Sequence, residues 1–166
     1  MKLSVFVVTY NQEKYIRQCL DSILMQEVDF DYEVVIGEDH GTDGTRAICE
    51  EYAEKYPQVR LLPLTENLGV AGNWRRVLLE CKGEYVAMCE GDDFWTDENK
   101  LQKQFDIMES DPDFSFAAHT VRCTDEKGEP TDEIIPLKGD VKTGILTSEE
   151  AIGGICRLPY MFQTSS

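Results

Sequence analysis

The sequence predicts an α/β fold with a mostly parallel central sheet. Short apolar runs rich in β-branched residues alternate with amphipathic stretches of helical length along residues 3–119. Strands that alternate with helices of this length form βαβ units, and successive βαβ units build a parallel sheet. The chain has 166 residues, which is the size of one domain. We therefore expect a single domain over residues 1–166.

The first unit begins with the apolar run 3–8, which is expected to be a buried strand. Asn11 belongs to the residue types that cap helices, and we expect it to cap the helix that follows. That helix has one apolar stripe, which consists of Tyr15, Ile16, Cys19, Leu20, Ile23 and Leu24.

The next units repeat this order of strand and helix. Asp43, in the turn-rich segment 40–44, is expected to cap the second helix, and Pro57 ends it. The remaining predicted strands lie at 33–37, 59–64, 85–89 and 114–119, and a loop is predicted at 67–69. Three further helices are predicted: one that ends near 55, one over 71–81 and one that ends at 111–112.

The alternation ends after residue 120. Residues 125–128 favour a hairpin turn. The segment 134–155 is short, has no regular pattern of apolar residues and contains glycine. We expect residues 121–166 to form an irregular extension at the edge of the sheet instead of another βα unit.

The chain carries a strong negative charge. Its 32 acidic and 16 basic side chains give a formal net charge of −16. Such a charge repels nucleic acid phosphates and anionic lipid headgroups within about 10 Å. No apolar run approaches the ~20 residues that cross a bilayer. We expect a cytoplasmic domain that neither binds nucleic acid nor inserts into a membrane, and that needs a divalent cation or a few arginines to hold a phosphorylated substrate.

The six cysteines form no C-x-x-C pair, and His40 and His119 do not lie at metal-finger spacing. Several cysteines fall on apolar faces. We interpret them as small buried side chains of a protein in a reducing compartment.

Polar and acidic residues follow the predicted strands at the edge where open α/β sheets bind ligands. They are Thr9, Tyr10 and Asn11 after the first strand, Glu38 and Asp39 after the second, Asn67 and Gly69 after the third, and Glu90, Gly91, Asp92 and Asp93 after the fourth. Two acidic clusters at one edge of one sheet indicate a functional site.

The segment 90–93 has the pattern of a site for a hard cation. Alternate residues present two carboxylates to one side, and Gly91 lets the backbone approach a ligand closely. Mg²⁺ and Mn²⁺ take one or two carboxylates and complete their shell with water and phosphate oxygens. The alternative is that Asp92 or Asp93 caps the following segment and Asp97 caps the next helix.

Other candidates have two interpretations each. Asp39 is placed to accept a hydrogen bond from a pyrimidine N–H or a ribose hydroxyl, or it belongs to a turn. Arg76 is either a phosphate or base contact or a solvated helix residue. The sequence favours a core position for Trp74 and a structural role for His119. Trp95 is either a core residue or a platform for a ring of the ligand. The glycine-rich motifs of dinucleotide-binding and P-loop proteins are absent from the sequence.

Four segments together resemble family 2 glycosyltransferases with the GT-A fold: SVFVVTYN (4–11), EVVIGEDHGTDGT (33–45), ENLGVAGN (66–73) and GEYVAMCEGDDFW (83–95). A fifth segment, WTDENKLQKQFDIM (95–108), is similar to bacterial members that build surface polysaccharides. The resemblance covers residues 3 to about 120 and implies a Rossmann-like α/β/α sandwich. It makes 3–120 the nucleotide-sugar half and 121–166 the start of the acceptor side.

The resemblance implies a metal-dependent transfer of a sugar from a nucleotide diphosphate sugar, with a UDP-sugar favoured, to a hydroxyl of a carbohydrate or lipid-linked acceptor. Mn²⁺ or Mg²⁺ would be the cofactor, ligated by Asp92 with the support of Asp93. The nucleotide-binding residues that it implies are Thr9, Tyr10, Asn11, Asp39, Asn67, Gly69, Asn73, Arg76, Glu90 and Gly91.

The sequence departs from the family pattern at several positions. Glu38 and Glu90 replace aspartates, and His40-Gly41 replaces Gly-Ser. Inverting members take their general base from a later segment, which the resemblance places beyond Ser166. Two alternatives stay open: a nucleotidyltransferase, although residues 9–14 lack the glycine-rich basic loop, and a non-catalytic module that binds nucleotide sugars.

Overall fold

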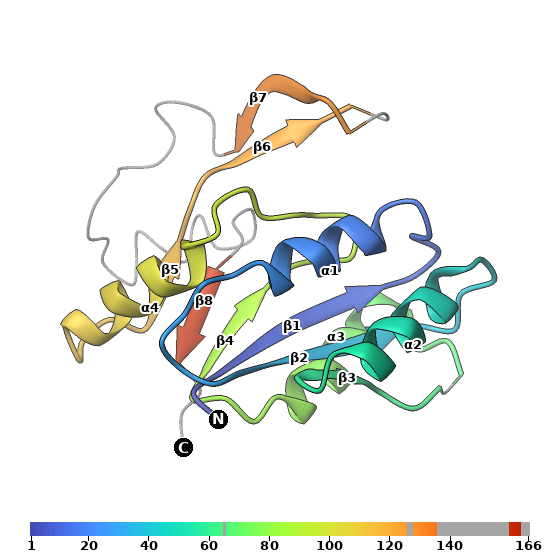
Figure 1. The fold of residues 1–166 in the computed structure, drawn as a ribbon, viewed down its shortest axis with the longest axis horizontal. Helices are drawn as coiled ribbons and strands as arrows, with labels where there is room; N and C mark the ends of the chain where they lie inside the picture. The colour runs from blue at the N-terminus through green and yellow to red at the C-terminus, as the bar shows by residue number, and fades with distance from the viewer. Residues whose placement is uncertain (65, 126–127, 136–159, 164–166) are drawn as a thin grey trace.

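The computed structural model describes residues 1–64, 66–125, 128–135 and 160–163. A central sheet lies between two layers of helices (Figure 1), so the predicted α/β sandwich with a parallel central sheet is confirmed. None of the described helices has the length and apolar character to span a bilayer. The helices are α1 (Ile16–Leu24), α2 (Thr45–Lys55), α3 (Gly69–Glu80) and α4 (Lys100–Ser110).

The central sheet has six strands in the order β3-β2-β1-β4-β8-β5. Their bounds are β1 (Leu3–Thr9), β2 (Tyr32–Glu38), β3 (Val59–Leu61), β4 (Tyr85–Met88), β5 (Phe116–Ala118) and β8 (Tyr160–Gln163). Strand β1 pairs in parallel with β2 on one side and with β4 on the other, and β2 pairs in parallel with β3. The residues that follow β1 therefore lie between those that follow β2 and β4.

Strand β1 is buried on both faces because its side chains alternate between two cores. Val5 and Val7 belong to the core under α1, α2 and α4, whereas Phe6 belongs to the core under α3. The ring of Phe6 packs against Trp74, with 4.8 Å between the ring centroids. A near-continuous apolar run is typical of a parallel strand that is covered on both faces. Trp74 is a half-buried aromatic that packs against this core, in agreement with the structural role that the sequence favoured.

The prediction that Asn11 caps the first helix is wrong. Helix α1 begins at Ile16, with Tyr15 at the cap position and no side-chain cap. Asn11 instead has a φ of 53°, and its Oδ1 accepts a hydrogen bond from the N–H of Thr42 over 2.7 Å. Asparagine tolerates this left-handed conformation better than most residues. Its side chain ties the loop after β1 to the loop after β2.

Asp43 lies one residue before the cap position of α2, which Gly44 occupies. Its Oδ1 nevertheless accepts hydrogen bonds from the N–H and the hydroxyl of Thr45, over 3.0 and 2.6 Å. Its Oδ2 accepts one from the N–H of Glu13 over 3.1 Å. The prediction misplaced the cap residue by one position, but the carboxylate does satisfy the first helical N–H.

Several predicted strands are shorter in the structure. Strand β3 ends at Leu61 because Pro63, two residues later, has no N–H to continue the ladder. Strands β4 and β5 also lose residues at their ends relative to the expected 85–89 and 114–119. Helix α3 begins two residues earlier than expected, so Gly69, with a φ of 70°, is both the last residue of the predicted loop at 67–69 and the first residue of the helix.

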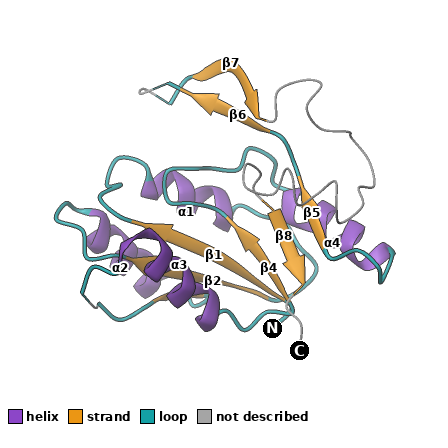
Figure 2. Ribbon diagram, turned by 180° about the vertical axis from the view of Figure 1, so that it is seen from behind, coloured by secondary structure: helices purple, strands orange, loops and turns teal. Residues whose placement is uncertain are grey.

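The chain beyond residue 120 contributes two separate features. Strands β6 (Val121–Thr124) and β7 (Pro130–Ile135) form a two-stranded sheet of their own, which stands away from the central sheet in Figures 1 and 2. The predicted turn at 125–128 is confirmed by a hydrogen bond from the N–H of Gly128 to the carbonyl of Asp125 over 2.9 Å. The predicted irregular segment lies outside the described residues from 136 on.

Strand β8 corrects the expectation of an edge extension. It pairs antiparallel with β4 on one side and with β5 on the other. Residues 160–163 therefore lie inside the central sheet, and they separate β5 from the parallel block.

The cysteines agree with the prediction of buried thiols in part. Cys19, Cys49 and Cys89 are buried, whereas Cys81 and Cys123 are half-buried, and all five are free thiols. Burial raises the pKa of Cys49 to about 12, which keeps this thiol protonated and unreactive.

Candidate functional site at the carboxyl edge of the sheet

The carboxyl end of β1 is the centre of the candidate site. The N–H of Asp39 donates to the carbonyl of Thr9 over 3.0 Å, and the N–H of Gly91 donates to the carbonyl of Val8 over 2.9 Å. These two bonds extend the strand pairing past β2 and β4. They place the first acidic cluster on one side of Thr9 and the second on the other side, as the parallel order predicted.

Asp39 is fixed by the loop that precedes α3. Its side chain is 4% exposed, and its Oδ1 accepts a hydrogen bond from the N–H of Leu68 over 2.8 Å. The side-chain amide of Asn67 donates to the carbonyl of Asp39 over 2.8 Å, and its Oδ1 accepts from the N–H of Gly69 over 3.1 Å. The structure therefore brings the loop at 67–69 to Asp39, which the sequence had placed only at the same edge.

Buried oxygen atoms without hydrogen-bond partners gather near this edge. Among the described residues they include Thr9 Oγ1, Gln12 Oε1, Glu38 Oε2 and Asn73 Oδ1. A Cβ added to Gly91 would lie 2.7 Å from Thr9 Oγ1 and 2.5 Å from Gln12 Oε1, so both oxygens border the same point of the backbone. A buried polar atom without a partner costs about 1–3 kcal/mol. These oxygens fit a site that water or a ligand completes.

Gln12 was not identified from the sequence. Its position three residues after the end of β1 was the available signal, because the same reasoning had selected Thr9, Tyr10 and Asn11. Its backbone N–H donates to the Thr45 hydroxyl over 2.8 Å, which fixes this residue against the start of α2.

The acidic segment after β4 forms a tight turn, in which the N–H of Asp93 donates to the carbonyl of Glu90 over 2.9 Å. The carboxylates of Glu90, Asp92 and Asp93 are exposed and accept no hydrogen bond within the described part of the chain. The alternative that Asp92 or Asp93 caps the next segment therefore has no support in the contacts. Asp97 does accept a hydrogen bond from the N–H of Asn99 over 3.0 Å, next to the start of α4.

Crowded negative charge marks this turn. Partial desolvation, together with the nearby carboxylates of Asp93 and Asp92, raises the pKa of Glu90. Partial desolvation and Asp92 raise the pKa of Asp93 in the same way. A cation placed between the carboxylates would remove this repulsion. The observation fits a divalent cation at Asp92 and Asp93.

The described residues offer such a cation only part of its shell. They contain no group of three or more histidine, cysteine, aspartate or glutamate side chains arranged to hold a metal ion. Mg²⁺ is commonly held by one or two carboxylates together with water and substrate phosphates. The chemistry of the donor set therefore fits a cation that binds together with a phosphorylated ligand.

The other predicted residues lie around this centre. Tyr10 is 49% exposed at the end of β1. Asn73 is 3% exposed, and its Nδ2 donates to the carbonyl of Gly37 over 2.7 Å, which anchors α3 on β2. Arg76 donates to the carbonyl of Pro63. The contacts of Asn73 and Arg76 position α3, and their contact with a nucleotide stays a prediction.

Trp95 is a core residue with one covered ring face. It is buried, and its backbone N–H donates to the hydroxyl of Ser22 over 3.0 Å. The ammonium of Lys100 lies 3.9 Å from the centroid of its ring. The ring face therefore carries the ammonium of Lys100. Of the two interpretations that the sequence left open for Trp95, the contacts favour the core residue over a platform for a ring.

The profile of the family described as Glycosyl transferase family 2 matches residues 4–156. An uncharacterized protein of Mycobacterium tuberculosis is 43% identical over 136 residues, which are 81% of this chain and 39% of that protein. TuaG of Bacillus subtilis, a glycosyltransferase assigned to teichuronic acid biosynthesis, is 34% identical over 134 residues, which are 80% of this chain and 52% of TuaG. The chain thus spans about half or less of the length of these relatives.

Two glycosyltransferases are among the solved structures with a similar fold. TarS of Staphylococcus aureus (residues 1–349, in complex with UDP) is similar with a TM-score of 0.59 and 30% identity, over 75% of this chain and 35% of that chain. The mannosyltransferase PcManGT of Pyrobaculum calidifontis, in complex with GDP-Man and Mn²⁺, is similar with a TM-score of 0.62 and 29% identity, over 69% of this chain and 34% of that chain.

Proposed function

Because this chain belongs to glycosyltransferase family 2 and has the GT-A fold, we propose that it binds the donor in a reaction that transfers a sugar from a nucleotide diphosphate sugar to a hydroxyl acceptor. The observation that carries the proposal is the meeting of Thr9, Asp39 and the acidic segment 90–93 at the end of β1. Open α/β sheets bind ligands at this edge. Residues 3–120 would form the donor half.

The nucleotide would occupy the edge between the two acidic clusters. Asp39 would accept a hydrogen bond from the base, Thr9 and Tyr10 would line the nucleoside pocket, and Glu90 would contact the ribose. The loop at 67–69, which is already bonded to Asp39, would close over the nucleotide. We favour UDP, since the similar TarS was solved with UDP and with UDP-GlcNAc.

Asp92 and Asp93 would hold Mn²⁺ or Mg²⁺. When bound, the metal neutralises the charge of the leaving diphosphate. The raised pKa values of Glu90 and Asp93 support this assignment, because partial desolvation and neighbouring carboxylates disfavour their charged forms, and a bound cation would offset that cost. The Mn²⁺ in the similar mannosyltransferase supports it as well.

In the proposed reaction, the acceptor oxygen attacks the anomeric carbon of the donor sugar. The bond from that carbon to the diphosphate oxygen breaks, and its electron pair leaves with the diphosphate. A general base takes the proton of the acceptor hydroxyl. Attack in line with the leaving group would invert the anomeric centre. The chain's contribution is to orient the donor and to hold the charge of the diphosphate.

The acceptor would be a carbohydrate or a lipid-linked glycan of the cell surface. Two relatives support this class, since TuaG is assigned to teichuronic acid biosynthesis and TarS is named a poly(ribitol-phosphate) β-N-acetylglucosaminyltransferase. A cytoplasmic location is proposed from the free cysteines of the described part of the chain.

Calorimetry with UDP, in Mn²⁺ and in EDTA, tests the function. We expect saturable binding in Mn²⁺ and much weaker binding in EDTA, because a chain of net charge −16 repels a bare diphosphate. At a hundredfold excess over Kd the ligand should stabilise the fold by about 2.7 kcal/mol, which a thermal-shift measurement detects. Equal affinity in both buffers would contradict the proposed metal dependence. Failure of every nucleoside diphosphate to bind would contradict the proposed donor-binding function. Binding without transfer to any glycan would favour the non-catalytic module.

A further inference from the structure

A pocket of about 310 Å³ lies between the start of α4 and the β6–β7 hairpin. Its lining comes from residues 94–97, Lys100, residues 119–122, Thr124 and Pro130. Phe94 directly follows Asp93, so the pocket begins where the acidic segment of the donor site ends. None of the residues assigned to the donor lines it.

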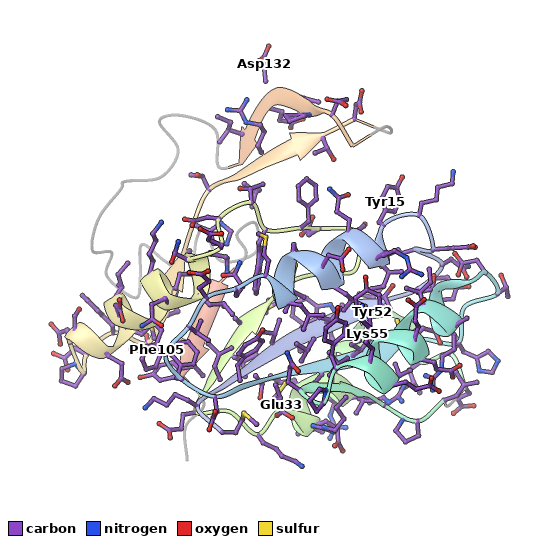
Figure 3. The ribbon with its side chains drawn as sticks, in the orientation of Figure 1. Tyr15, Glu33, Tyr52, Lys55, Phe105 and Asp132 are labelled. Carbon is purple, nitrogen blue, oxygen red and sulfur yellow. The ribbon has the colours of Figure 1, made fainter. Side chains whose placement is uncertain are left out.

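The pocket is basic although the chain is strongly acidic. Lys100, His119 and Arg122 line it, and Asp97 is the one acidic side chain in the lining. The carboxylate of Asp97 is already engaged, because its Oδ2 lies 2.6 Å from the ammonium of Lys103 and its Oδ1 accepts the N–H of Asn99. Asp132, an acid on the same hairpin, points away from the rest of the protein (Figure 3). The remaining side-chain charge in the pocket is positive.

The two cations are held in place by packing and hydrogen bonds. The ammonium of Lys100 lies over the ring of Trp95 and donates to Gln104 Oε1 over 2.7 Å. Gln104 in turn donates to the carbonyl of Ala117 in β5 over 3.3 Å. Arg122 donates to the carbonyl of Thr131 over 3.2 Å, which fixes its guanidinium on the hairpin. A guanidinium has five N–H donors, so this bond leaves donors for a ligand.

His119 adds a hydrogen-bond acceptor to the pocket. Its Nδ1 lies 3.0 Å from the carbonyl of Thr120, and because a carbonyl only accepts, Nδ1 carries the proton. Its Nε2 is buried and has no partner in the described part of the chain. Burial, and the charge of Lys100, lower the pKa of His119. The ring is therefore neutral at pH 7, and Nε2 presents a lone pair to a hydroxyl.

We propose that this pocket binds an anionic, hydroxyl-bearing unit of the acceptor, with a phosphate or carboxylate between Lys100 and Arg122 and a hydroxyl that donates to Nε2 of His119. The inference rests on the proposed function, since it assigns the acceptor of that reaction. A polyol phosphate and a uronic acid share this chemistry. Both carry an anion and a neighbouring hydroxyl on one small unit.

Titration of the isotope-labelled chain by NMR, at pH 7, constant ionic strength and without divalent cation, tests the proposal. Glycerol 3-phosphate and glucuronate are the two anionic probes, and glycerol is the uncharged control. We expect at least one anionic probe to saturate signals of the pocket residues, while glycerol does not. The probe that binds identifies the anion as a phosphate or a carboxylate. If neither saturates, the proposal is overturned.

The variants Lys100→Met and Arg122→Gln should each weaken the probe by about tenfold, the effect of losing one charge-assisted contact. Methionine keeps an apolar stem against Trp95. Lys55→Met is the matched control, because the ammonium of Lys55, the last residue of α2, also lies near an aromatic ring, 4.8 Å from the ring centroid of Tyr56. Lys55 is remote from the hairpin in Figure 3. Loss of affinity in Lys55→Met equal to that in Lys100→Met overturns the proposal. His119→Gln, which keeps a polar group in place of the ring, supplies a second variant should Lys100→Met fail to fold.

Repeating the titration with saturating UDP and Mn²⁺ separates the pocket from the donor site. We expect the probe to bind with unchanged affinity, because none of its proposed contacts belongs to the donor. Displacement of the probe by UDP would show that the pocket holds part of the donor, and it overturns the acceptor role. If UDP fails to bind while the probe still does, the proposed function falls and the anion site stands.

Discussion

Asp39 Oδ1 accepts a hydrogen bond from the N–H of Leu68 over 2.8 Å. This bond joins the end of β2 to the residue before α3. The carboxylate that we assign to the nucleotide base therefore also holds the loop at 67–69 against the site. A change at Asp39 acts on the ligand and on this loop together.

Asp39→Asn should weaken the binding of UDP by about 1–3 kcal/mol, the cost of an imperfectly paired buried polar contact. The amide oxygen still accepts the bond from Leu68, but the charge is lost and the amide can turn its donor inward. The loss should be the same in Mn²⁺ and in EDTA, as measured by calorimetry. Asp31→Asn, an exposed change at the opposite end of β2, is the control. Wild-type affinity in Asp39→Asn would remove Asp39 from the nucleotide site.

Asp92→Asn should abolish the gain in UDP affinity that Mn²⁺ gives. Its side chain accepts no hydrogen bond within the described residues, so the melting temperature of the free protein should not fall. Asp106→Asn is the control, because Asp106 is an exposed acid on α4 that accepts from Gln102. Full Mn²⁺-dependent tightening in Asp92→Asn would show that the metal lies elsewhere.

Glu90→Gln should make the free protein more stable at pH 7. Because partial desolvation and the neighbouring carboxylates of Asp93 and Asp92 raise the pKa of Glu90, the folded state holds this proton more tightly than the unfolded state does. The stability from Glu90 is fully present below the unfolded pKa and is lost as pH rises through the folded value. Urea unfolding should therefore separate variant and wild type at pH 7 and give equal stabilities near pH 4. A variant that is less stable at pH 7 contradicts the repulsion.

Binding of the anionic probe should weaken above pH 8. Burial lowers the pKa of Lys100 to about 8, so its charge is present below that pH and lost above it. Among the other ionisable groups that line the pocket, His119 is already neutral and Asp97 stays ionised beside Lys103 in this range. A guanidinium keeps its charge in proteins. NMR titrations at pH 7 and pH 9 measure the change. The same decline in Lys100→Met would assign the titration to another group.

Glu33→Gln should lower stability without a change in UDP affinity. The buried Glu33 accepts hydrogen bonds from the hydroxyl of Ser4 over 2.8 Å and the N–H of Lys82 over 2.9 Å, and it pairs with Arg60 over 3.4 Å. It lies near the start of β2, whereas Asp39 follows the last residue of that strand. We expect a loss of about 1–3 kcal/mol in the free energy of unfolding. The exposed Glu84→Gln loses a surface ion pair with Lys2 and should cost less than Glu33→Gln. Reduced UDP binding in Glu33→Gln would contradict the separation of this cluster from the site.

Local sequence patterns predicted the parallel block well. The apolar runs of β1, β2 and β4 and the helical stripes follow from periodicity, and the parallel order then puts the residues after these strands at one edge. Strand β8 was not predicted, because its four residues pair with β4 and β5, and pairing between distant segments leaves no local pattern. Asn11 was misassigned for a related reason, since its partner Thr42 comes from another loop.

The same distinction explains the site. Thr9, Asp39 and the acidic segment each end a strand, so topology alone places them together. Lys100, His119 and Arg122 come from a helix, the end of a strand and a hairpin, and only the tertiary structure joins them in a pocket. The sequence did not indicate a basic pocket, because these three residues are few among the 32 acidic side chains of a chain with net charge −16.

The position of β8 also sets the order in which the sheet is completed during synthesis. Strands β1 to β4 and the acidic turn that follows them are made by residue 93, so the sheet edge with Thr9, Asp39 and this turn can assemble early. Strand β5 has β8 as its neighbour in the sheet, and it waits until the ribosome has released residues 160–163. Until then β4 presents unpaired N–H and C=O groups, which are a template for pairing with other chains. The nascent protein therefore passes through a stage in which the edge with Thr9, Asp39 and the acidic turn is formed, while β4 still lacks its second neighbour in the sheet.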